Sequence, residues 1–76
     1  MQRQTHTIPR AAVTRILVNA GAKRVSEEAS NAFAEVVEQI ATEIGNSANN
    51  IARHTGRKTV HDVDIKLAKE QKYGKY

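Results

Sequence analysis

One long amphipathic stretch, residues 27 to 54, constrains the fold of this chain more than any other feature. Apolar residues recur there every three to four positions: Ala29, Phe33, Val36, Val37, Ile40, Ile44, Ala48 and Ile51. This spacing is typical of one face of an α-helix, and no proline interrupts it. Ser26 is a good N-cap, the acids after it favour the positive end of the helix, and Gly56 can end the helix in a left-handed turn. The pattern therefore predicts one continuous helix.

The length of this helix predicts a dimer. At 1.5 Å per residue it spans about 42 Å, whereas a compact chain of 76 residues has a diameter of roughly 30 Å. Two short flanking helices cannot cover so long an apolar stripe, and no cysteine is present to staple a small core. We therefore expect a second copy to cover it, most simply with twofold symmetry. The alternative is a monomer whose helix breaks within residues 45–50, which are rich in weak helix formers.

The flanking segments predict two short helices and an all-α fold. Pro9 suits the first turn of a helix capped by Thr7 or Ile8, and Gly21 ends that helix. Thr59 is expected to cap a third helix, with Asp62 completing a capping-box-like arrangement. We assign residues 1–7 to a short flexible arm, 8–72 to one domain and 73–76 to a C-terminal extension. The order is short helix, loop, long central helix, loop, short helix.

The charges of the chain are segregated, although its net charge is only +4. Residues 1–24 carry five bases and no acid, residues 25–52 five acids and no base, and residues 53–76 seven bases against three acids. Such segregation indicates basic patches for an acidic polymer, although charged segments are more often only solvated faces. No apolar run is long enough for a membrane span or a signal peptide, so we expect a soluble, intracellular protein.

Several functional classes are disfavoured. The sequence has no glycine-rich phosphate loop, cysteine nucleophile, metal cluster or clustered carboxylates, so we expect no enzyme, no cofactor and no small-molecule substrate. Helix-turn-helix recognition is disfavoured because the bases concentrate in the loops rather than along one helix. Three aromatic residues are too few for a single-strand stacking platform.

Two segments of the sequence closely resemble the loop regions of archaeal histones. They are Asn19-Ala-Gly-Ala-Lys-Arg-Val-Ser26 and Ala52-Arg-His-Thr-Gly-Arg-Lys-Thr-Val60, the latter followed by Asp64 and Ile65. The resemblance covers about residues 8 to 70. It implies a histone fold and a handshake dimer that binds and compacts double-stranded DNA largely without sequence specificity, with dimers stacking into longer multimers. It also implies a cytoplasmic, nucleoid-associated protein without a metal site. A heterodimer with a paralogue, or a subunit of a transcription or replication factor, remains the alternative.

The resemblance also implies roles for individual residues. Arg24 matches an arginine that enters the minor groove, Arg15 a base facing DNA, and Lys58 and Thr59 a pair that contacts phosphate. Basic side chains and capping residues near the helix starts complete the set of predicted DNA-binding residues. The full set is Arg10, Arg15, Lys23, Arg24, Ser26, Arg57, Lys58 and Thr59. Arg57 and Asp64 match a structural ion pair that supports the second loop.

Four positions are implied to mediate contacts between dimers. Ile51, His54 and Asp64 match the site where dimer packs against dimer, and Gly21 matches a small residue where stacked turns approach closely. By themselves, His54 and Asp64 would also suit half of a metal site or part of a catalytic triad, although no third partner is indicated. One departure from the family pattern is Asn31, a polar residue where many relatives carry an apolar one.

Overall fold

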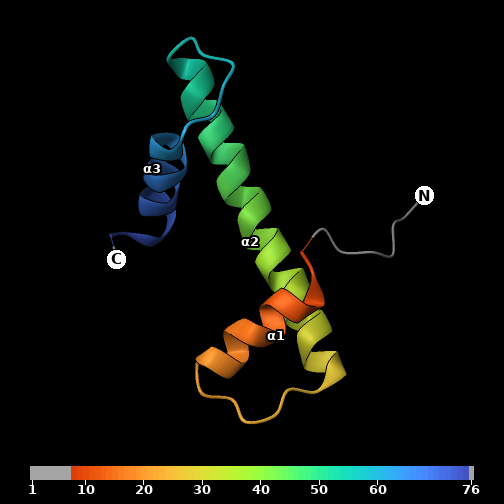
Figure 1. The fold of residues 1–76 in the computed structure, drawn as a ribbon. Helices are drawn as coiled ribbons and strands as arrows, with labels where there is room; N and C mark the ends of the chain where they lie inside the picture. The colour runs from red at the N-terminus through yellow and green to blue at the C-terminus, as the bar shows by residue number, and fades with distance from the viewer. Residues whose placement is uncertain (1–7, 76) are drawn as a thin grey trace, which may run out of the picture. The chain divides into compact units, whose positions relative to one another are not determined.

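The fold is all-α, as predicted. A computed structural model describes residues 8 to 75, in which the chain forms α1 (Arg10–Asn19), α2 (Glu27–His54) and α3 (Asp62–Tyr73), without a strand (Figure 1). The central helix α2 runs through residues 45–50 without a break, so the broken-helix alternative is wrong. The predicted arm, residues 1–7, and Tyr76 lie outside the described residues. None of the three helices is both long and apolar enough to cross a membrane.

The first loop is held at both ends by helix caps. At the end of α1, Gly21 has a φ of +117°, and the N–H groups of Gly21 and Ala22 donate to the carbonyls of Val18 and Leu17 over 3.0 and 3.1 Å. This is the Schellman arrangement that favours glycine. At the start of α2, the Ser26 hydroxyl accepts the N–H of Ala29 over 3.0 Å, which confirms its predicted capping role.

The start of α1 differs from the prediction by one position. Pro9, rather than Thr7 or Ile8, occupies the N-cap position, with an extended backbone at φ −65° and ψ 139°. Its fixed φ suits either position, and its carbonyl accepts the N–H of Val13 over 3.4 Å, which begins the helical ladder.

The second loop begins with a glycine turn similar to that at Gly21, but the helix after it is capped by a residue other than the predicted one. Gly56 has a φ of +81°, and the N–H groups of Gly56 and Arg57 donate to Arg53 and Ala52, each over 3.0 Å, as predicted for a glycine cap. The predicted cap of α3 by Thr59 is wrong, because the N-cap residue is His61. The Asp64 carboxylate accepts the N–H of His61 over 2.8 Å and so closes the first turn two residues later than expected.

The described chain divides into two compact units, with the division between Gln39 and Ile40. In the first, α1 packs against the N-terminal part of α2, and Val13 and Ala34 are fully buried. In the second, α3 packs against the C-terminal part of α2 along Ala48, Ala52 and Ala68 (Figure 1). The seam between α2 and α3 is built from alanine, which lets the two helices approach closely but buries little apolar area.

Much larger apolar side chains remain exposed on the described chain. They are Ile16, Val18, Val36, Ile40, Val60, Val63, Ile65, Leu67 and Tyr73, each at least 38% accessible. Both units carry such residues. A single exposed apolar residue needs no explanation, but so many in so small a chain are consistent with coverage by another chain. The fold thus agrees with the expectation of a dimer drawn from the length of α2.

Candidate nucleic-acid interface

The first loop carries two basic side chains between two helix ends that are held by hydrogen bonds. Lys23 and Arg24 are exposed and lie between the Gly21 turn and the Ser26 cap. Because both neighbouring turns are hydrogen-bonded, the backbone that carries Arg24 is held next to the first turn of α2. Nothing lies within 4 Å of where a Cβ on Gly21 would sit, so this face of the turn is open to the close approach predicted for it.

Arg15 lies on the outer side of α1. It is exposed and follows the fully buried Val13 by two residues, about 200° of helical rotation, so it points away from the seam with α2. Arg15, Lys23, Arg24 and Ser26 all belong to the first unit, whereas the predicted residues of the second loop belong to the second unit.

The second loop is organised by one ion pair. Arg57 Nη1 and Nη2 donate to Asp64 Oδ2 and Oδ1, each over 2.9 Å, and Nη1 also donates to the Thr59 carbonyl over 2.8 Å. The Asp64 side chain is only 2% exposed, and its Oδ2 also accepts the His61 N–H. One guanidinium therefore binds both the start of α3 and the loop backbone at Thr59, in the two-pronged geometry that favours arginine over lysine.

These contacts shift the pKa of both partners. The hydrogen bonds from Arg57, followed by that from the His61 N–H, lower the pKa of Asp64 from 3.8 to about 2. The same Asp64 hydrogen bond raises the pKa of Arg57 above its ordinary value. Both groups therefore stay charged at neutral pH, and the pair persists.

Lys58 and Thr59 are exposed on the loop that this ion pair fixes. The sequence predicted two roles for Arg57, and the structure shows the ion pair with Asp64, whereas a DNA contact by Arg57 stays a prediction. Since most of the Arg57 charge is met by Asp64, Lys58 is the better candidate for a phosphate contact here. Thr59 contributes its carbonyl to the loop, which leaves its exposed hydroxyl available.

Arg10, also predicted to bind DNA, has an internal partner that local sequence patterns did not reveal. Its Nη1 donates to Glu27 Oε2 and to Asn31 Oδ1, each over 3.1 Å, and so joins the start of α1 to the start of α2. Beneath it, the hydroxyls of Thr14 and the buried Ser30 are 2.6 Å apart. The one available signal was Asn31, whose polar side chain departs from the family pattern.

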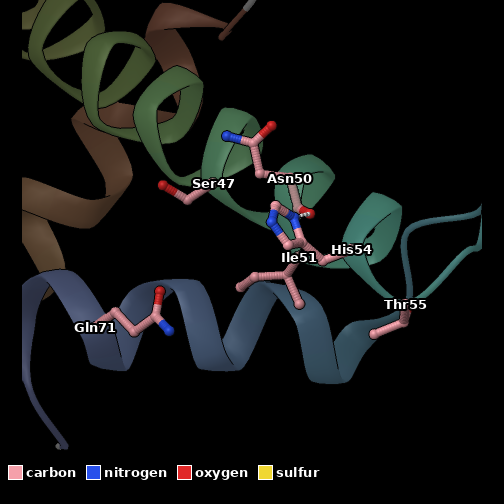
Figure 2. A pocket seen from close by; sticks show the side chains of 6 residues that line it. All are labelled: Ser47, Asn50, Ile51, His54, Thr55 and Gln71. Carbon is pink, nitrogen blue, oxygen red and sulfur yellow. Dashed lines mark hydrogen bonds between the residues drawn. The ribbon is translucent and has the colours of Figure 1, made fainter.

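A shallow recess lies near the end of α2, where dimer–dimer contacts are predicted (Figure 2). It is lined by Ser47, Asn50, Ile51, His54, Thr55 and Gln71. His54 Nδ1 lies 2.9 Å from the Asn50 carbonyl; because a carbonyl only accepts, Nδ1 carries a proton. Asp64, the third predicted contact, is buried against Arg57 and does not line this recess, so its part in a dimer–dimer contact stays a prediction.

The alternative reading of His54 and Asp64 as part of a metal site or triad gains no support. The partner of Asp64 is Arg57, and that of His54 is a backbone carbonyl. Among residues 8–75, no group of three or more His, Cys, Asp or Glu side chains is arranged to hold a metal ion.

Comparison with known proteins gives a consistent result. The family described as histone-like transcription factor (CBF/NF-Y) and archaeal histone matches residues 6–68. An archaeal histone HAN1 subunit of Thermococcus zilligii is 49% identical over 61 residues, which cover 80% of this chain and 91% of that protein. Probable archaeal histone 3 of Methanocaldococcus jannaschii has the same identity over the same shares of the two chains.

Proposed function

This chain belongs to the family of histone-like transcription factors and archaeal histones, a family of DNA-binding chromatin proteins with a histone fold, and we propose that it wraps double-stranded DNA as a homodimer. The wrapping is largely independent of sequence, and dimers stack into longer assemblies along the duplex. The protein is accordingly associated with the chromosome in the cytoplasm.

The observation that carries this proposal is the construction of the second loop. Arg57, Asp64 and the Thr59 carbonyl form a rigid support whose charges balance, and Lys58 stands exposed on it. A single cation on a fixed backbone suits a phosphate, which carries no sequence information. A loop built to read bases would need several side chains aimed at base edges instead.

The first loop supports the same function. Arg24 is exposed beside the start of α2, where backbone N–H groups and the helix dipole favour a phosphate. Arginine suits a narrow minor groove because its planar guanidinium is more weakly hydrated than an ammonium group. Arginines that enter the minor groove where it faces a protein bend DNA around that protein without base-specific contacts.

Dimerisation is supported by the exposed apolar side chains of both units. Packing within one chain leaves Ile40, Val63 and Leu67 exposed, and covering them with a second copy removes them from water. The second candidate function, that of a protein which pairs only with a different histone-fold chain, uses the same surface. It predicts a purified protein that stays monomeric until that partner is added, whereas our proposal predicts a dimer of the chain alone.

Nuclease digestion of long duplex DNA saturated with the protein tests the proposal. We expect a ladder of protected fragments at regular spacing, because stacked dimers protect DNA in equal increments. The variant His54→Ala should shorten the ladder while sedimentation still shows a dimer. One short protected fragment would refute stacking but not DNA binding, and no protection at all would refute the DNA-wrapping function.

A further inference from the structure

The ion pair between Arg10 and Glu27 lies beside the basic first loop, in the first unit of the chain. It joins the first residue of α1 to the first residue of α2 over 3.1 Å. A shallow recess borders it, lined by Arg10, Ala11, Thr14, Val25, Glu27 and Ser30. The pair is open to solvent, with 47% of the Arg10 side chain and 74% of the Glu27 side chain exposed.

The geometry of this pair differs from that of Arg57 and Asp64. Arg57 uses both terminal nitrogens on a carboxylate that is 2% exposed, whereas Arg10 uses Nη1 alone for both Glu27 and Asn31. A guanidinium has five N–H donors, so most of those of Arg10 face away from these partners. An exposed pair with one shared donor nitrogen is weak, because water screens the charges and both side chains lose freedom.

A DNA phosphate is a strong competitor for such a guanidinium. It can accept two parallel hydrogen bonds from the guanidinium, where Glu27 accepts only one, its negative charge repels the Glu27 carboxylate, and its binding releases condensed counterions. Asn31 would still hold Arg10 in place after the exchange, because its amide oxygen carries no net charge to repel the phosphate.

We propose that Glu27 masks Arg10 in the free protein and that a DNA phosphate displaces it on binding, so that Glu27 sets the affinity of this surface for duplex DNA. The inference rests on the DNA-binding function proposed above. In this arrangement Glu27 lowers the affinity of the protein for duplex DNA, and Arg10 contacts a phosphate only after Glu27 has been displaced.

The test is a set of matched variants measured on one duplex by fluorescence anisotropy at several salt concentrations. Glu27→Gln removes the masking carboxylate. Glu28→Gln is the control, because it removes the same charge from the next position in the first turn of α2, where Arg10 does not bind. Each is also combined with Arg10→Ala and, to preserve side-chain length, with Arg10→Gln. Circular dichroism verifies that every variant is folded.

We expect Glu27→Gln to raise affinity by about 1.5- to 5-fold per chain beyond Glu28→Gln, the range for breaking an exposed ion pair. The excess should vanish when Arg10 is replaced. Equal gains for the two glutamine variants, a gain that survives without Arg10, or a loss of affinity in Glu27→Gln would each overturn the masking role. Wild-type protein that fails to bind duplex DNA would instead overturn the proposed function.

Discussion

Replacing Lys58 with alanine should make duplex binding less sensitive to salt without unfolding the protein. Each chain of the proposed dimer contributes one Lys58, and the loop that carries it is fixed by Arg57 rather than by Lys58 itself. About 0.9 counterions are released per neutralised phosphate, so the plot of log Kobs against log salt has a negative slope. The loss of two contacts reduces the magnitude of that slope by about 1.8. Between 50 and 200 mM salt, the wild type should therefore lose roughly 12-fold more affinity than the variant.

The assay is a salt titration of duplex affinity for the wild type, Lys58→Ala and the control Lys66→Ala. Lys66 is also an exposed lysine, but it lies on α3 outside both loops, so its removal changes net charge equally. Thermal unfolding should place both variants within about 0.5 kcal/mol of the wild type, as is usual for exposed positions. An unchanged slope in Lys58→Ala would refute its phosphate contact. If the slopes of both variants are equal and both smaller in magnitude than that of the wild type, then only the net charge of the protein sets the salt dependence.

Two further predictions concern the first loop and the ion pair of the second. Arg24→Ala should lower duplex affinity by about tenfold for each lost charge-assisted contact, to a similar extent on unrelated sequences, as measured by competition binding; an unchanged affinity would remove Arg24 from the interface. Because the pKa of Asp64 falls from 3.8 to about 2 on folding, its pair with Arg57 stabilises the protein fully above about pH 4, and this contribution is lost as the pH falls through 2. In thermal melts followed by circular dichroism at a series of pH values, Asp64→Asn should unfold at a lower temperature than the wild type at neutral pH, and the difference should shrink toward pH 2. A difference that stays constant as the pH falls would contradict this role of the pair.

The features that the sequence predicted correctly depend on nearby residues. The helical repeat of α2 is visible over eight apolar positions, and each of Gly21 and Gly56 ends a helix where the repeat stops. Ser26 caps the residue three positions later, which is again a local contact. The ion pair between Arg57 and Asp64 spans seven residues and was predicted only through the resemblance to archaeal histones.

Of the features that the sequence missed, the cap of α3 is decided within the second loop, and the partners of Arg10 are decided by a contact between two helices. Thr59 has the side chain of a good cap for α3, but Asp64 is held by Arg57 and closes the helix on His61 instead. Arg10 meets Glu27 and Asn31, which lie 17 and 21 residues further along the chain. The composition of a loop does not show which residues of the two flanking helices come together. Sequence patterns therefore indicate only that Arg10 faces solvent or DNA.

The alanine seam between α2 and α3 links the fold of this protein to its association. Ala48, Ala52 and Ala68 let the two helices approach closely and lose no side-chain freedom on burial, but each removes little apolar area from water. Leu67 and Val63, which would bury far more, remain exposed on α3. A chain built in this way gains further hydrophobic stabilisation when a second chain covers those side chains. In the proposed dimer, folding and dimerisation are coupled, so the midpoint of unfolding depends on protein concentration, and DNA that binds only the dimer stabilises the fold as well.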